Sequence, residues 1–153
     1  MDTGSREVLE YHYPSTLESV DQAEQEILHA AEKSGFDEDE QHRIGMAVRE
    51  CMVNAVVHGN RYNKNKHVHV SVWIERSEPN GRFHVRVRDE GEGFELHEVP
   101  DPLHDTNLLR HSGRGLFLMG AFMDHMEVRK APQGGTEVTL VKNIGQRDEA
   151  AGS

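Results

Sequence analysis

The spacing of apolar residues predicts an amphipathic helix near the start of the chain. Between Leu17 and Ala31 the apolar residues recur every three or four positions, which is the period of a helix with one buried face. Ser34-Gly35 should end this helix, because glycine readily takes the left-handed conformation that follows a helix. Asp37 followed by Glu40 resembles a capping box, which predicts that a second helix begins there.

The second helix should extend to Gly59-Asn60 with one face turned inward. The residues of that face are Ile44, Val48, Cys51, Ala55 and His58. We therefore expect His58 to serve packing rather than catalysis. The polar residues 61–66 that follow are typical of a loop.

Elsewhere apolar and polar residues alternate with a period of two, which predicts β-strands. The alternating segments are residues 7–13, 68–75, 82–89, 125–130 and 136–142. The first should lie at a sheet edge. Pro79-Asn-Gly81 and residues 132–135 should form hairpin turns. Residues 91–112 form a long connection, which inside a compact domain is usually functional, and residues 113–123 return to a helical pattern.

The order of these elements predicts an α+β fold. Strands and helices do not alternate strictly, so a doubly wound parallel sheet is not expected. We predict a two-layer α/β sandwich, in which helices cover one face of a mixed, mostly antiparallel sheet. A single domain should span residues 16–143, preceded by a leader with the edge strand (1–15) and followed by a flexible tail (144–153).

The charge balance narrows the function classes. The 153 residues carry a net charge of −10, from 17 basic and 27 acidic side chains, which argues against direct nucleic-acid binding. Cys51 is the only cysteine, which excludes an internal disulfide and a cysteine-based zinc cluster. The N-terminus lacks a secretion signal, and no apolar run approaches the roughly 20 residues that span a bilayer. We expect a cytoplasmic protein that binds no membrane.

Two polar residues of the second helix suggest metal chemistry. Glu50 and Asn54 are four positions apart, so both project from one helix face. The amide oxygen of Asn54 can ligate Mg2+, and the carboxylate of Glu50 can orient or deprotonate a nucleophile. Taken alone, the pair fits a solvated helix face better.

A glycine-rich segment follows the predicted strand 82–89. An aspartate at a strand end, such as Asp89, can accept a hydrogen bond from the exocyclic amine of adenine. Gly91 and Gly93 would let the backbone approach a ligand. A turn that merely ends the strand explains the same residues.

Two further segments suit an adenine nucleotide. Gly113-Arg-Gly115 precedes a predicted helix, where free amide groups and the helix dipole attract an anion, and Arg114 would add a donor for a terminal phosphate. A helix cap with a solvated arginine fits equally well. The hydroxyl of Thr136, at the start of the last strand, could complete the hydrogen bonding around adenine.

In combination these segments resemble the motifs of the GHKL (histidine kinase-like) ATPase superfamily. The matching segments are residues 50–59 (Glu-Cys-Met-Val-Asn-Ala-Val-Val-His-Gly), 89–94 (Asp-Glu-Gly-Glu-Gly-Phe), 113–116 (Gly-Arg-Gly-Leu) and 135–136 (Gly-Thr). More narrowly, residues 54–59, 112–119 and 123–124 resemble the bacterial anti-sigma-factor serine/threonine-protein kinases of the RsbW type. The resemblance covers about residues 17–142.

The resemblance implies ATP and Mg2+ as cofactors and assigns a role to each motif. Glu50 would be the general base that activates a substrate serine, and Asn54 the magnesium ligand. Asp89 would bind adenine and Thr136 would support the base. The remaining implied residues shape the pocket (Gly91 and Gly93), form a lid (94–112) or hold phosphate (Gly113, Arg114 and Gly115).

The resemblance also implies partners. These are a sigma factor and a single-domain anti-sigma-factor antagonist that is phosphorylated on serine, with the kinase itself a homodimer. Two other functions remain open. One is a nucleotide-dependent binding module with little or no kinase activity. The other is a metal-binding protein, suggested by the 11 histidines, among them His67 and His69 on one strand face and His97, His104 and His111 at intervals of seven.

Overall fold

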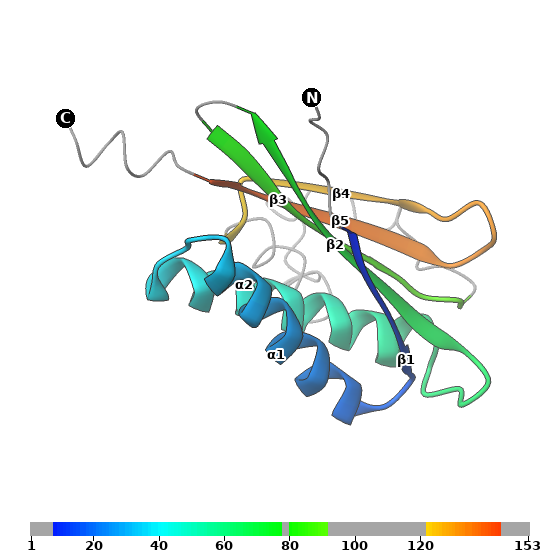
Figure 1. The fold of residues 1–153 in the computed structure, drawn as a ribbon. Helices are drawn as coiled ribbons and strands as arrows, with labels where there is room; N and C mark the ends of the chain where they lie inside the picture. The colour runs from blue at the N-terminus through cyan, green and yellow to red at the C-terminus, as the bar shows by residue number, and fades with distance from the viewer. Residues whose placement is uncertain (1–7, 78–79, 92–121, 145–153) are drawn as a thin grey trace, which may run out of the picture.

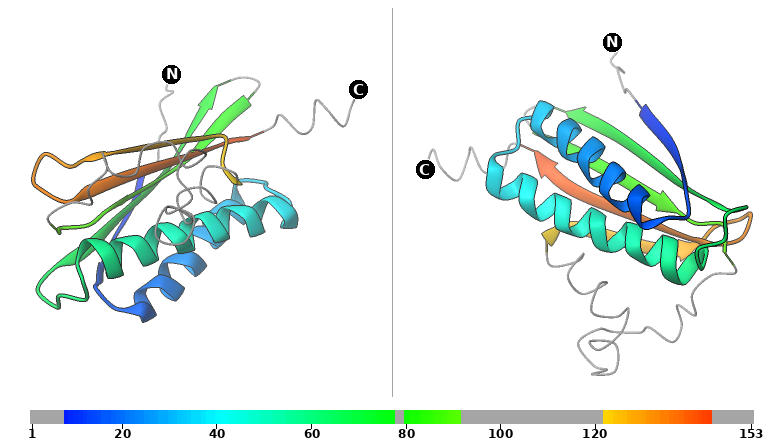
Figure 2. Two further views of the ribbon diagram at one scale, coloured as in Figure 1. Left: turned by 180° about the vertical axis from the view of Figure 1, so that it is seen from behind. Right: turned by 90° about the horizontal axis from the view of Figure 1, so that it is seen from below.

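The computed structural model describes residues 8–77, 80–91 and 122–144. Its elements are β1 (Val8–Pro14), α1 (Leu17–Lys33), α2 (Glu38–Val53), the π-helical segment η1 (Asn54–Gly59), β2 (His67–Ser77), β3 (Asn80–Arg88), β4 (His125–Lys130) and β5 (Thr136–Ile144). The strands form a five-stranded sheet in the order β1-β2-β3-β5-β4, and neighbouring strands are antiparallel. Both helices pack on one face of this sheet (Figures 1 and 2). The predicted α+β sandwich is confirmed, with β1 at an edge.

The helix boundaries follow from local capping. The Asp37 carboxylate accepts a hydrogen bond from the backbone N–H of Glu40 at 2.8 Å and so caps α2, as the sequence predicted. At the start of α1 the Thr16 hydroxyl accepts from the backbone N–H of Ser19 at 3.3 Å. The first helix ends just before Gly35, whose φ of +100° is left-handed.

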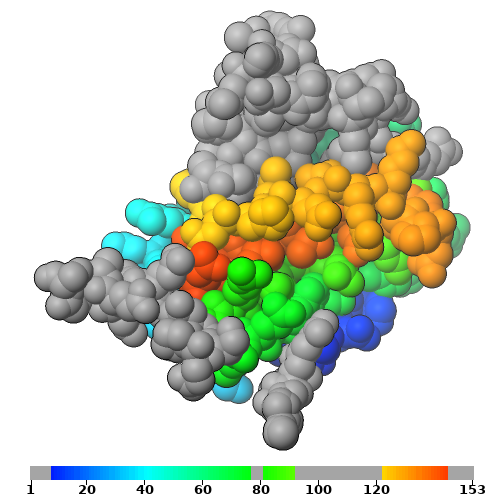
Figure 3. All heavy atoms as spheres, turned by 90° about the horizontal axis from the view of Figure 1, so that it is seen from above, coloured from blue at the N-terminus to red at the C-terminus, as the bar shows by residue number. Residues whose placement is uncertain are grey.

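The core lies between the helices and the inner face of the sheet. Its fully buried side chains alternate along the strands and recur at helical spacing along α1 and α2. They include Val20, Ile27, Ile44, Val48, Met52, Val68, Val70, Val85 and Leu140. Phe36, just before α2, contacts Phe83 of β3 edge to face, with ring centroids 5.5 Å apart. The other face of the sheet is seen in Figure 3, where β4 and β5 lie beside the green strands.

The end of the second helix differs from the prediction. From Asn54 the backbone turns more widely, and the N–H of Asn60 bonds to the carbonyl of Ala55, five residues earlier, at 2.8 Å. The wider turn rotates the side chains that follow, so Val56 is buried and His58 is exposed. The prediction that His58 lies on the inward face is therefore wrong.

The β2–β3 hairpin is longer than the sequence indicated. Gly81 pairs with Arg76, so Asn80 and Gly81 belong to β3 rather than to a turn. The connection between the strands falls on residues 78 and 79, outside the described residues. Most of the predicted helix 113–123 and the predicted tail also lie outside them.

Candidate functional site

Asp89 occupies an inward position at the end of β3. Val85, Val87 and Asp89 alternate onto the face that the helices cover, and Asp89 is only 2% exposed. Its Oδ1 accepts hydrogen bonds from the backbone N–H groups of Gly91 (2.9 Å) and Thr136 (3.2 Å). No described residue donates a hydrogen bond to Oδ2. One carboxylate oxygen is thus fixed by the backbone, and the other receives no donor from the part of the chain that the structure describes.

Three glycines let separate segments meet around Asp89. A Cβ atom on Gly59, at the end of η1, would lie closer than 3.0 Å to the Oδ2, Cγ and Cβ atoms of Asp89. A Cβ on Gly91 would collide with the backbone of Gly59, and one on Gly135 with the backbone of Asp89. Any larger residue would force the segments apart, so glycine is required by contact. Of the three, only Gly91 was predicted to have a role in the site, although Gly59 and Gly135 also fall within the matching motifs.

The electrostatic setting of Asp89 favours a ligand that donates a hydrogen bond. Burial raises the pKa of Asp89 above its ordinary value of 3.8, and the N–H groups of Gly91 and Thr136 partly offset this. The positive charges of Arg88 and Lys66 also lower the pKa. Lys66 lies in the loop 61–66, which the sequence analysis left without a role. The exocyclic amine of adenine is a hydrogen-bond donor of the kind that the Asp89 Oδ2 atom lacks among the described residues.

Asn54 and Glu50 precede Gly59 along the second helix. Glu50 lies near the end of α2, and Asn54 is the first residue of η1. Asn54 is 5% exposed, and its buried Nδ2 atom has no hydrogen-bond partner within residues 8–77, 80–91 and 122–144. Buried amides are almost always paired, so this Nδ2 donor calls for a hydrogen-bond acceptor, whereas a cation would bind the Asn54 side-chain oxygen. Glu50 is half-buried, one helical turn before Asn54. An amide and a carboxylate on one helix face supply the oxygen ligands that Mg2+ prefers, so these residues fit that ion.

The structure unites some of the predicted residues. Asp89, Gly91 and Thr136 are joined by hydrogen bonds, and Thr136, which is buried, also accepts the Asp89 N–H at 3.0 Å through its backbone carbonyl. The roles predicted for Gly93, Gly113, Arg114, Gly115 and the lid 94–112 fall outside the described residues and stay predictions.

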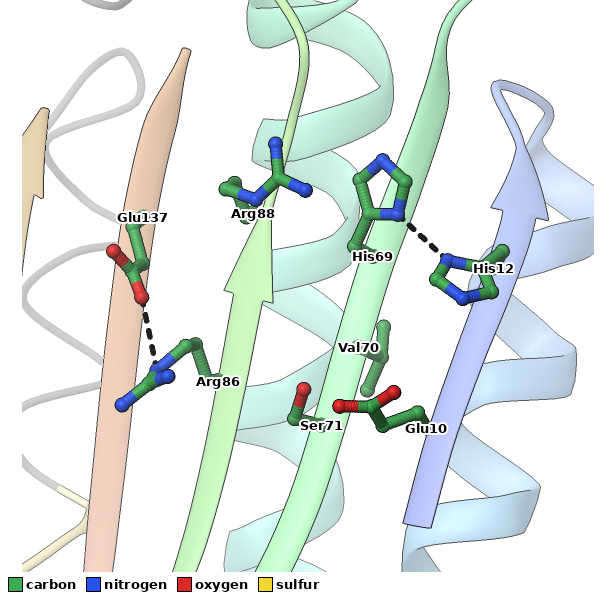
Figure 4. A pocket seen from close by; sticks show the side chains of 8 residues that line it. All are labelled: Glu10, His12, His69, Val70, Ser71, Arg86, Arg88 and Glu137. Carbon is green, nitrogen blue, oxygen red and sulfur yellow. Dashed lines mark hydrogen bonds and ion pairs between the residues drawn. The ribbon is translucent and has the colours of Figure 1, made fainter. Parts of the chain in front are cut away.

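A separate hollow of about 280 Å³ lies on the sheet face turned away from the helices (Figure 4). Its charged side chains are already engaged in part: Arg86 pairs with Glu137 at 2.9 Å, and His12 contacts His69 at 2.6 Å between Nδ1 atoms. Arg88 also lines it. Consecutive strand residues point to opposite faces of a sheet. Arg88 lines this hollow and Asp89 points to the face that the helices cover, so the hollow and the Asp89 site lie on opposite faces.

Within residues 8–77, 80–91 and 122–144, no three histidine, cysteine, aspartate or glutamate side chains converge to hold a metal ion. Over the same residues, no helix has the length and apolar character needed to cross a membrane.

Comparison with known proteins defines the class. The family model of the histidine kinase-like ATPase domain matches residues 13–142, so the chain belongs to that family. The predicted resemblance is confirmed. Among its relatives is the anti-sigma F factor of Geobacillus kaustophilus (strain HTA426), 39% identical over 108 residues that cover 69% of this chain and 71% of that protein. The anti-sigma F factor of Bacillus subtilis (strain 168) is 34% identical over the same shares.

Proposed function

We propose that this protein is an anti-sigma factor and an ATP-dependent protein serine kinase. It binds a sigma factor, and it phosphorylates an anti-sigma-factor antagonist on serine. The observation that carries the proposal is the buried Asp89 carboxylate inside an ATPase-family domain, with one oxygen fixed by backbone N–H groups and the other without a donor among the described residues. The names of the relatives, anti-sigma F factors, support the regulatory half.

The nucleotide would lie along the second helix, with its base at the Gly59 end. Asp89 Oδ2 accepts the exocyclic amine of adenine, and the close approach of Gly59 and Gly91 shapes the pocket around it. The side-chain oxygen of Asn54 would hold Mg2+, and the ion would neutralise part of the negative charge of the phosphates. Gly113, Arg114 and Gly115 add hydrogen-bond donors to the phosphate end.

Glu50 is placed in this scheme as the general base. The substrate serine oxygen attacks the γ-phosphorus while the bond from that phosphorus to the β,γ-bridging oxygen breaks. The serine proton passes to the Glu50 carboxylate, and ADP and phosphoserine are formed. Glu50 is half-buried on the same helix face as Asn54, which keeps the base beside the metal-bound phosphates.

Phosphorylation would also control partner binding. The new phosphate adds about two negative charges to the antagonist, and this chain carries a net charge of −10. Repulsion therefore weakens docking of the modified antagonist and leaves the kinase free for the sigma factor. We propose that the kinase acts as a homodimer, and its role in bacterial transcription requires a cytoplasmic location.

The direct test compares two charge-neutralising variants of the same helix. Wild type, Glu50→Gln and Glu38→Gln are incubated with Mg2+, labelled ATP and the antagonist, and label on serine is measured. Glu38 is exposed in the first turn of α2, so its variant controls for the change in charge. Loss of transfer in Glu50→Gln alone is expected, by about 10²-fold or more. Undiminished transfer would remove Glu50 as the base.

The second candidate is a nucleotide-dependent binding module without appreciable turnover. It is favoured by the same Asp89 carboxylate, because recognition of a base by Asp89 would require no catalytic group. Native mass spectrometry with the sigma factors of the same organism, with and without MgATP, separates the two. An ATP-dependent sigma complex without label transfer to any antagonist would favour the module.

A further inference from the structure

Asn60 is a buried residue directly after η1, and all of its hydrogen-bonding groups are engaged. It is 2% exposed. Its backbone N–H donates to Ala55 O (2.8 Å), its backbone carbonyl accepts from Asn63 N–H (2.9 Å), Oδ1 accepts from Glu90 N–H (2.7 Å), and Nδ2 donates to Ser15 Oγ (2.9 Å) and His67 O (3.0 Å). These partners belong to the segment before α1, η1, the loop, the start of β2 and the second residue after β3. The side chain alone joins Ser15, His67 and Glu90, so it ties together three of the segments that surround Asp89.

The chemistry of the partners fixes which way the Asn60 amide points. The N–H of Glu90 can only donate and the carbonyl of His67 can only accept, so a reversed amide would set donor against donor. The position therefore needs an acceptor and a donor on one short planar group. Asparagine meets this need, whereas aspartate keeps the acceptor and loses the donors.

The bond from Asn60 to Glu90 acts on the peptide unit that follows Asp89. Glu90 is held on its other side as well, because its carboxylate accepts from the N–H of His67 at 3.1 Å and contacts His69 Nε2. Partial burial works to raise the pKa of Glu90, but these hydrogen bonds outweigh it and lower the pKa. The Asp89–Glu90 peptide is thus clamped, and with it the direction of the Asp89 side chain.

The loop that Asn60 begins is itself unfavourable for its sequence. Arg61 and Tyr62 have φ values of +52° and +60°, a left-handed conformation that side chains rarely adopt. The backbone bond from Asn63 to Asn60 helps to hold this turn, and Ser15 Oγ donates to Lys66 O at 2.6 Å at the far end of the loop. Strain of this kind persists where the surroundings over-determine the backbone, and it clusters at binding sites.

We propose that Asn60 is a positioning residue for adenine recognition. By holding the Glu90 N–H, it fixes the Asp89 carboxylate where Oδ2 meets the exocyclic amine, and so it sets the preference for adenine over guanine. The inference rests on the proposed nucleotide site, and it concerns a residue that does not touch the nucleotide.

The test measures nucleotide preference separately from stability. Wild type, Asn60→Ala, Asn60→Asp and Ser15→Ala are titrated with MgATP and MgGTP by calorimetry, below the melting temperature of each variant. The readout is the ratio of the two Kd values, GTP over ATP. Asn60→Ala should lower this ratio about tenfold, which is the worth of one well-formed hydrogen bond to an ordered site.

The controls divide the network into its two halves. Asn60→Asp keeps the oxygen that faces Glu90, and Ser15→Ala removes only a partner of Nδ2, so both should melt at lower temperature and keep the ratio within about twofold. Asn60→Ser replaces Asn60→Ala if the latter shows no cooperative melting. If Asn60→Ala, or Asn60→Ser in its place, has the same ratio as wild type, the inference is overturned but the proposed function is not. The same holds if Ser15→Ala lowers the ratio equally. Wild-type protein that binds no ATP overturns the proposed function and this inference together.

Discussion

Replacing Gly59 with alanine tests whether the second helix closes directly on Asp89. Alanine is better than glycine in a helix by about 1 kcal/mol, so helix propensity alone predicts a more stable protein. The structure predicts the opposite. The new Cβ would lie closer than 3.0 Å to three atoms of the Asp89 side chain, which two backbone N–H groups hold in place. Overpacking of this kind costs about 1–3 kcal/mol of the free energy of unfolding.

The substitution should also weaken nucleotide binding. If the carboxylate is displaced, the variant loses a hydrogen bond to a charged acceptor, worth about 1.5–3 kcal/mol, and ATP should bind about 10- to 150-fold more weakly. Gly45→Ala is the matched control, because Gly45 lies in the same helix and its Cβ would meet only the far ends of Leu28 (3.1 Å) and Glu24 (3.3 Å), which can move. Calorimetric Kd values and urea unfolding of both variants give the comparison. Wild-type ATP affinity in Gly59→Ala, or equal losses in both variants, would refute the reasoning.

Two further predictions concern the polar residues of the site. Asp89→Asn keeps the Oδ1 acceptor but removes the carboxylate. Burial raises the pKa of the Asp89 carboxyl, so ionisation of this group in wild type destabilises the folded state as the pH rises above about 3.8. The variant should resist urea better than wild type at pH 7, with the gain shrinking towards pH 4, while ATP binding is lost; a variant less stable at pH 7 would contradict this. Asn54→Ala removes an amide whose Nδ2 atom has no hydrogen-bond partner among the described residues, so the free energy of unfolding should change by less than about 1 kcal/mol. Its ATP affinity should no longer differ between Mg2+ and EDTA buffers, and a retained Mg2+ dependence would argue against Asn54 as the ligand.

Local signals in the sequence were sufficient for most of the fold. The Asp37 cap and Gly35 marked helix ends because capping involves neighbours in the chain. Period-two alternation located the strands and placed Asp89 at the end of one of them. His125–Lys130 matched the predicted strand in full.

The remainder depends on contacts between distant segments. The hydrogen bond from Glu90 to Asn60 joins residues 30 apart, and no local pattern encodes it. The close approach of Gly59 to Asp89 is likewise visible only when η1 and the end of β3 are packed. The wide turn of η1 escaped prediction because π-helical turns are rare and occur mostly as single turns inside α-helices, and it moved His58 to the surface.

We propose that Asp89 and Asn54 bind opposite ends of one Mg2+-bound adenine nucleotide. A crystal structure of the protein with Mg2+ and a non-hydrolysable ATP analogue tests it most directly. We predict the adenine amine within about 3.2 Å of Asp89 Oδ2 and the metal on the side-chain oxygen of Asn54. A nucleotide bound away from Asp89, or crystals that contain none at saturating analogue, would contradict the account.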